Sequence, residues 1–226
     1  MNITETLAQE LNLRPEYVEN VISLLDEGNT IPFIARYRKE MHGSMDDQVI
    51  RQLSDRATYL RGLEKRKEDV MHAISEQGKL TAALKKSIEN ADTLTAVEDL
   101  YLPFRPKRKT RASAARAKGL EPLATRLIVG TKQSVEELAQ EFVSAEQEVN
   151  TWQDALSGAM DILAEDCSVN AALRGHLRAL IRNTGELVSS GKEVEKTVYE
   201  KYGVFSSPIR RIQSHQVLAL NRGERE

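Results

Sequence analysis

A strongly basic stretch lies near the middle of the chain. The segment "LYLPFRPKRKTRASAARAKGL", Leu100 to Leu120, holds seven basic residues and no acidic one. Guanidinium and ammonium groups bind phosphates, and the rings of Tyr101 and Phe104 could stack on a base. The alternative is a structural tie, in which the same rings pin an arm to a helical bundle while the cations pair with acids such as Glu98 and Asp99. Both interpretations remain open from the residues alone.

The conformation predicted for this stretch holds its cations apart. Pro103 and Pro106 lack backbone donors and restrict the residues before them, so "LPFRPKRK" is predicted to be an extended arm. A capped helix, "TRASAARAKG", follows, and a cation in its first turn opposes the helix dipole, which favours an anionic partner. Five cations are therefore the main candidates for phosphate contacts: Arg105, Lys107, Arg108, Lys109 and Arg111.

A second basic group follows a tight helix–loop–helix pattern near the N-terminus. Arg36, Arg38 and Lys39 of "ARYRKE" stand where helix-turn-helix proteins carry their recognition residues. That motif also needs a third, supporting helix. The alternative is a solvated polar helix face, which is the usual surface of a helix. We include these three residues as candidate nucleic-acid contacts.

Catalytic and metal-binding patterns are missing from the sequence. The phosphate-loop, dinucleotide, esterase and zinc-hydrolase motifs all fail. The four histidines are scattered, and Cys167 is the single cysteine, without a nearby base that would activate it. We therefore predict no enzymatic activity, no metal site and no cofactor.

Composition and spacing predict helices that must position these groups. Ala, Leu, Glu, Lys, Arg and Gln dominate, and aromatic residues make up 5% of the chain. We predict an all-α fold, a multi-helix array with an N-terminal helical hairpin, one long helix and an extended basic, proline-containing arm. The hairpin, helix-turn-helix-like, occupies residues 1–43 and a helical scaffold residues 44–226. The long helix lies within Met45 to Gln77, with Ser44 as its cap, because apolar residues recur there every three or four positions.

A row of acidic residues on a later predicted helix has two interpretations. Its spacing could aim two carboxylates at one ion. The row comprises Asp154, Asp161 and Glu165. The next helix, expected to lie antiparallel to the first, carries a ladder of arginines. The ladder comprises Arg174, Arg178 and Arg182. Ion pairing across this helix pair is the interpretation that we adopt.

Overall composition limits the setting of the protein. The chain holds 32 Lys and Arg against 34 Asp and Glu, so any basic surface is local. One cysteine and an N-terminus without an apolar run favour a reducing, cytoplasmic location. No segment approaches the roughly 18 apolar residues of a membrane span, so a membrane is not an expected partner.

Four motifs can be compared with known families, and the first two are long and specific. In chain order they are "LLDEGNTIPFIARYRKEMHGSMDD", "EDLYLPFRPKRKTRASAARAKGLEPLA", "DILAEDCS" and "SHQVLALNRGERE". Together they resemble the N-terminal portion of the Tex family of bacterial transcription accessory proteins, and the resemblance covers nearly the whole chain. The last motif breaks off in charged residues, so we expect the chain to be an N-terminal fragment of something larger.

The resemblance implies a nucleic-acid-binding protein acting around transcription, with this chain as its helical N-terminal scaffold. It also implies later domains that this sequence lacks: an RNase H-like domain, helix-hairpin-helix elements and an OB-fold, the last with the strongest binding. RNA or DNA is then the expected partner, mostly through those domains, and this chain adds weak, sequence-independent phosphate contacts. The alternative is a protein-interaction scaffold that binds RNA polymerase or a transcription factor and makes no nucleic-acid contact of its own.

Overall fold

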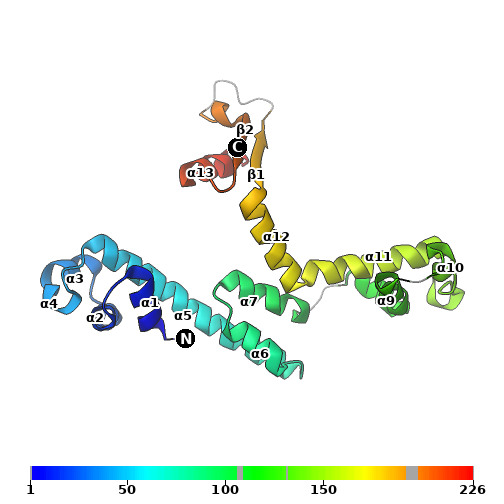
Figure 1. Cartoon of the computed structure of the whole chain (residues 1–226), viewed down its shortest axis with the longest axis horizontal. Helices are drawn as coiled ribbons and strands as arrows, with labels where there is room; N and C mark the ends of the chain where they lie inside the picture. Colours follow the sequence, from blue (N-terminus) through cyan, green and yellow to red (C-terminus); the bar gives the residue numbers. More distant parts are fainter. Residues whose placement is uncertain (1, 106–108, 131, 192–197, 226) are drawn as a thin grey trace. The chain divides into compact units, whose positions relative to one another are not determined.

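The computed structural model describes residues 2–105, 109–130, 132–191 and 198–225. These residues form two compact units, Met1–Phe104 and Arg105–Glu226. Helices dominate both units, and the strands of the described residues form a single short hairpin (Figure 1). The predicted all-α class is confirmed, with the strand hairpin as an unexpected addition. Among the described residues, no helix combines the length and the apolar character that crossing a membrane requires.

In the first unit, two hydrophobic cores lie along one long helix, and each includes residues of that helix. Its elements are α1 (Ile3–Leu11), α2 (Pro15–Asp26), α3 (Ile31–Tyr37), α4 (Lys39–His42), α5 (Asp47–Glu76), α6 (Ala82–Glu89), α7 (Leu94–Tyr101) and the 3-10 helix η1 (Leu102–Phe104). Helices α1 to α4 gather at one end of α5, and α6 and α7 pack against its other half (Figure 1). A separate hairpin domain over residues 1–43 stays a prediction.

Helix α5 confirms the predicted long helix but not its predicted cap. One face is buried along the helix, at Ile50, Leu53, Ala57, Leu60, Leu63, Val70 and Ile74. Ser44 is not the cap, because its φ of +66° makes it part of a left-handed turn with Gly43. Asp46 accepts the capping hydrogen bond from the Val49 N–H instead, at 2.8 Å. Its negative charge also suits the positive end of the helix dipole.

The predicted N-terminal hairpin is confirmed as α2 and α3. Helix α2 ends where Asn29 Nδ2 donates to the Leu24 carbonyl at 2.9 Å and Gly28 adopts a φ of +86°. Glycine takes this left-handed conformation without a steric cost. Pro32 lies in the first turn of α3, where a missing N–H costs little. Only Ile34 of α3 is buried, so most of this helix faces solvent.

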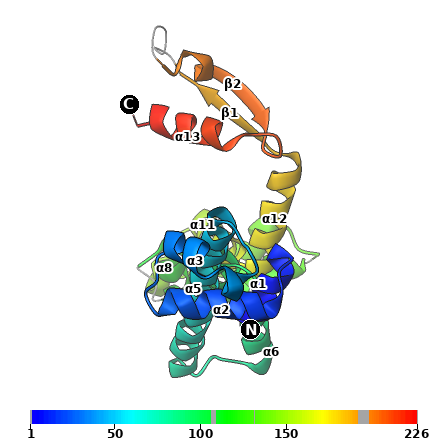
Figure 2. The ribbon, with the colours of Figure 1, turned by 90° about the vertical axis from the view of Figure 1, so that its left-hand side faces the viewer.

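The second unit packs three helices on α11 and then continues into a small strand hairpin. Its elements are α8 (Arg111–Ala117), α9 (Glu121–Val129), α10 (Val135–Gln140), α11 (Trp152–Val169), α12 (Ala171–Thr184), β1 (Glu186–Ser190), β2 (Val204–Pro208) and α13 (Ser214–Gly223), with 3-10 turns at Ala145–Gln147 and Glu200–Tyr202. Small residues let α8 lie close to α11, with Ala115 and Ala159 both in the core. The strands are antiparallel, with Glu186 opposite Pro208, and α13 runs beside them (Figure 2).

The expected antiparallel pairing of α11 and α12 is wrong. The two helices meet end to end at an angle (Figure 1), and none of the α12 residues is buried. A single residue, Asn170, separates them, and its side chain caps α12 by accepting from the Leu173 N–H at 2.9 Å. One residue cannot reverse the chain, because an antiparallel helix pair needs a loop of about 2–5 residues.

Candidate nucleic-acid interface

The first part of the basic arm, which we define as residues 102–111, is packed and not extended. Leu102–Phe104 form the 3-10 helix η1, so the predicted extended conformation is wrong there. Tyr101 and Phe104 pack against the core formed by α5, α6 and α7. The Phe104 carbonyl also accepts a hydrogen bond from Gln77 Nε2 at 2.9 Å. Tyr101 and the arm residue Phe104 therefore serve the fold of the first unit, as the structural-tie interpretation expected.

The described cations of the arm are exposed to solvent. Arg105 and Lys109 are exposed, and Lys107 and Arg108 lie outside the described residues. Arg111 Nη2 lies 3.4 Å from Asp161 Oδ1 of α11, but the Arg111 side chain is 87% exposed. An ion pair this exposed contributes little to stability and leaves the guanidinium accessible to a phosphate.

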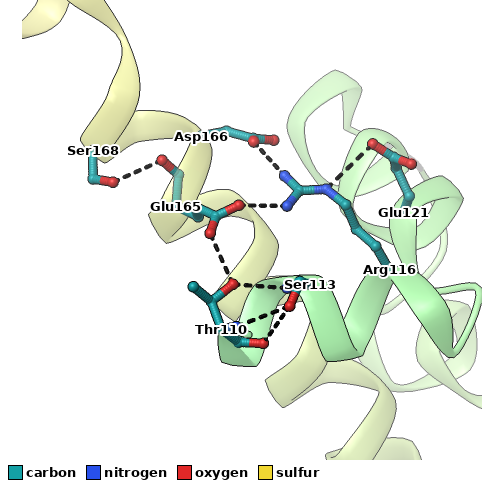
Figure 3. Close-up of polar contacts among 7 residues, drawn as sticks. All are labelled: Thr110, Ser113, Arg116, Glu121, Glu165, Asp166 and Ser168. Atoms are coloured by element: carbon teal, nitrogen blue, oxygen red, sulfur yellow. Dashed lines mark hydrogen bonds and ion pairs between the residues drawn. The ribbon is translucent and has the colours of Figure 1, made fainter. Parts of the chain in front are cut away.

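A polar network fixes the helix that follows the arm (Figure 3). Thr110 and Ser113 form a capping box at the start of α8, and Thr110 Oγ1 donates to Glu165 at 2.9 Å. Arg116 donates at 2.5 Å to both Glu165 and Asp166 of α11. The hydrogen bond to Glu165 raises the pKa of Arg116, because the carboxylate favours its charged form. The network anchors α8 to α11 and so holds the end of the arm.

The acidic row is divided among several partners. Asp154 accepts from the Thr151 N–H at 3.1 Å in the capping box that starts α11. Asp161 faces Arg111, and Glu165 binds Arg116. Ion pairing was the predicted role, and the two arginines that take part in these contacts belong to α8. Within the described ranges, no group of three or more His, Cys, Asp or Glu side chains is arranged to hold a metal ion.

A second exposed basic surface lies on α3 and α4, and we call it the α3–α4 patch. It consists of Phe33, Arg36, Tyr37, Arg38 and Lys39. Among the described residues, which include the neighbouring acid Glu40, no acidic group lies within 4 Å of the three cations of the patch. Two of the cations, together with Asp46 and Asp47, border an open hollow of about 480 Å³.

The aromatic rings of the patch were missed as functional candidates. The sequence places Phe33 and Tyr37 among the apolar residues of a hairpin helix, yet they are 36% and 64% exposed. Their ring centroids are 5.4 Å apart, and the Arg38 guanidinium lies 5.3 Å from the Phe33 centroid. The signal was the spacing, because positions 33 and 37 lie one turn apart and are neighbours on the helix surface.

Buried contacts hold the helices that carry the patch in place. His42 at the end of α4 is fully buried, and its Nε2 lies 3.1 Å from the Ile34 carbonyl oxygen. Asn20 of α2 donates to the Met41 carbonyl at 3.0 Å. Gly43 lies so close to Tyr17 that a Cβ there would be 2.3 Å from the Tyr17 ring. These contacts fix α4 against α2 and α3, so the patch is held by rigid elements.

The described residues thus define a mostly helical scaffold with two exposed basic surfaces. The Tex-like protein N-terminal domain family matches residues 1–75, and the Tex central region-like family matches residues 131–226. Together the two matches account for most of the chain. The chain belongs to the Tex family, which confirms the resemblance seen in the four motifs.

Curated relatives extend the match across the whole chain. It is 45% identical over its full length to the transcriptional accessory protein Tex of Neisseria gonorrhoeae and 44% identical over 99% of it to the uncharacterized protein YdcI of Bacillus subtilis. It is 32% identical over 99% of its length to the human S1 RNA-binding domain-containing protein 1. The chain spans only 30%, 32% and 23% of these relatives, respectively.

Proposed function

We propose that the chain is the helical N-terminal scaffold of a nucleic-acid-binding transcription accessory protein, and that it makes weak, sequence-independent contacts with phosphates. The observation that carries this proposal is a set of exposed cations with no acidic partner within 4 Å among the described residues. They are Arg36, Arg38, Lys39 and Lys109. Such cations attract polyanions without reading sequence. The names of the relatives, which refer to transcription and to an RNA-binding domain, support the same class of partner.

The basic arm contributes to this proposal through its second half. Lys109 is exposed, and Arg111 is held at the start of an anchored helix with a weak, solvent-exposed ion pair. Exchange of that carboxylate contact for a phosphate contact would cost little, because exposed ion pairs contribute about 0–1 kcal/mol. Contacts by Arg105, Lys107 and Arg108 stay predictions from the sequence.

A second candidate function is a protein-interaction scaffold that binds RNA polymerase or a transcription factor. The observation that favours it is the apolar face of α12, where Leu177, Leu180 and Ile181 are 44%, 48% and 55% exposed. An amphipathic helix whose apolar residues are exposed to solvent is typical of a surface that binds another protein. In this alternative, the exposed cations keep the chain soluble and bind nothing.

We also propose that the chain is not an enzyme and that it acts in the cytoplasm. The acids that could have formed a catalytic pair are engaged in capping and ion pairing, and the single cysteine, Cys167, is exposed at the end of α11. A free thiol suits a reducing compartment.

Salt dependence separates the two candidate functions. The 226-residue chain is titrated with fluorescently labelled single-stranded RNA and duplex DNA at two salt concentrations. Phosphate binding by several cations should weaken steeply as salt rises, since each neutralised phosphate releases a counterion. The proposal fails if neither nucleic acid binds at low salt, or if binding does not respond to salt.

A further inference from the structure

We propose that Phe33 and Tyr37 form a stacking surface for unpaired bases, so that the α3–α4 patch binds single-stranded nucleic acid in preference to duplex. This inference rests on the proposed function and adds to it the class of nucleic acid and the side chains that select it. Phosphate contacts alone do not separate single strands from duplexes, whereas exposed rings do, because only an unpaired base offers a free face.

The rings are exposed and already held in position. Phe33 and Tyr37 contact each other at a tilt of 46°, on a helix whose only buried residue is Ile34. The Arg38 guanidinium, close to the Phe33 ring, further restricts that ring. A ring that is fixed before binding loses little conformational entropy when a base stacks on it. Most of the Tyr37 surface remains available, since the residue is 64% exposed.

Other arginine–aromatic pairs of the first unit show why the patch differs. The guanidinium of Arg56 lies 4.9 Å from the Tyr59 centroid, but it also forms an ion pair of 2.7 Å with Glu10. Arg66 lies over the Tyr101 ring and pairs with Glu98 at 2.6 Å. Both of these arginines form ion pairs with carboxylates within the fold. In a third pair, the Arg14 guanidinium lies 5.8 Å from the Tyr17 centroid, but that ring packs against the core.

Arg38 has its ring contact with Phe33 but no carboxylate partner among the described residues. Arg36 and Lys39, on either side of it in sequence, likewise lack one. Three cations without compensating acids beside two exposed rings therefore match the two parts of a nucleotide, an anionic phosphate and an aromatic base.

Charge around the patch limits what can bind there. Segment 31–43 carries three Lys and Arg side chains and one acid, Glu40, and Asp46 and Asp47 also line the hollow beside it. These two acids lie at the start of α5, where they cap and favour that helix. A phosphate backbone should therefore follow the α3–α4 side of the hollow. An acidic protein segment would meet the same cations, but it would not need the exposed rings.

The test compares Tyr37 variants of the full 226-residue chain. Binding of a labelled 12-nucleotide single-stranded RNA and of a duplex DNA of the same length is measured by fluorescence anisotropy. Tyr37→Ala should weaken single-strand binding by about fivefold or more, because stacking on one ring contributes roughly 1–3 kcal/mol per base. Duplex binding and the salt slope should stay unchanged. Tyr37→Phe, which keeps a ring, should bind like the parent chain.

A control uses a second aromatic pair among the described residues, Tyr202 and Phe205, whose centroids are also 5.4 Å apart. Tyr202→Ala should leave single-strand binding unchanged. A direct reading of stacking comes from Tyr37→Trp, whose added fluorescence should be quenched by single-stranded RNA and not by duplex. Because position 37 is exposed, circular dichroism and thermal melting should match the parent chain for each Tyr37 variant.

The outcomes separate this inference from the proposed function. If the parent chain binds neither nucleic acid, the proposed function fails and the inference fails with it. If the parent chain binds but Tyr37→Ala binds equally well, the stacking surface is refuted while the phosphate contacts stand. If a labelled acidic peptide binds the patch with Tyr37 dispensable and single-stranded RNA does not bind, the patch is a protein-docking surface and the inference is wrong.

Discussion

The basic arm and the α3–α4 patch are similar in sequence, since both join arginines and lysines to aromatic residues, but they differ in how the fold uses these side chains. In the arm, Phe104 packs into a core, and Arg111 faces a carboxylate of α11. In the patch, Phe33 and Tyr37 are exposed, and among the described residues the neighbouring cations have no acidic partner. A basic aromatic sequence therefore predicts a binding surface only when the fold leaves its rings and charges unoccupied.

The same comparison explains how each surface is positioned. The arm ends at α8, which a network of ion pairs and hydrogen bonds attaches to α11 (Figure 3). The patch lies on short helices that hydrogen bonds of His42 and Asn20 hold in place. Charged side chains thus form contacts within the fold beside the arm, whereas the cations of the patch are exposed.

The largest expected effect is on the stability of the second unit. Arg116→Ala should lower its free energy of unfolding by about 1–3 kcal/mol, because Glu165, whose side chain is 14% exposed, loses its ion pair with Arg116. Urea unfolding followed by circular dichroism measures this loss. The exposed pair of Arg126 and Glu141 provides the control, since Arg126→Ala should change the unfolding midpoint little. Equal effects for the two variants would mean that the network does not anchor α8.

A smaller effect, on binding, separates the two surfaces. Replacing both Lys109 and Arg111 of the arm by glutamate should weaken single-strand and duplex binding alike and flatten the salt slope by roughly one unit per lost phosphate contact. Replacing Arg36 and Lys39 by glutamate should weaken single-strand binding more than duplex binding. Lys85→Glu on α6 controls for a change of charge outside both surfaces. If the arm variant binds normally but melts earlier, the arm is a structural tie.

The ion pairs of the first unit predict a modest dependence of stability on pH. Hydrogen bonds from Arg56 and Arg61 lower the pKa values of Glu10 and Asp26, respectively. Their contribution is complete above the unfolded pKa values of about 4.3 and 3.9 and is lost as pH falls through the lower folded values. Urea unfolding between pH ~7 and pH ~3 should show this loss, and Glu10→Gln should reduce it. Stability that rises toward low pH would contradict these shifts.

The last prediction concerns cleavage of nucleic acid, for which we expect no effect. Incubation of the chain with labelled RNA or DNA and Mg²⁺ should yield no cleavage, because the acids of α11 serve as a cap and as ion-pair partners. Gel electrophoresis of the labelled strand checks this. Cleavage that disappears in Asp161→Asn would show that the acidic row is catalytic and would overturn the proposal of a non-enzymatic scaffold.

Local patterns predicted much of the fold because their information is contained within one element. The spacing of Ile50, Leu53 and their successors predicted α5, and Gly28 with Asn29 predicted the turn before α3. The cap of α5 was misplaced by two residues, because Ser44 and Asp46 are both good caps and the left-handed turn at Ser44 decides between them.

Contacts between elements were less predictable, because the spacing of residues defines a helix face but does not say which element packs against it. The acidic row was expected to meet the arginines of α12, yet Asp161 and Glu165 meet α8, which the close packing at Ala115 brings onto α11. Exposure of Phe33 and Tyr37 has the same origin. Their apolar character was evident, but the core of the first unit takes Ile34 fully and Ile31 and Ala35 in part from α3, which leaves these two rings outside it.

Photo-crosslinking tests the contrast between the two surfaces most directly. The full chain is irradiated with single-stranded RNA that contains 4-thiouridine, and the crosslinked peptides are mapped by mass spectrometry. We predict crosslinks in the peptide that carries Phe33 and Tyr37, reduced in the Tyr37→Ala variant, with weaker crosslinks around Lys109. Crosslinks confined to residues 105–118, or unchanged by Tyr37→Ala, would contradict the account.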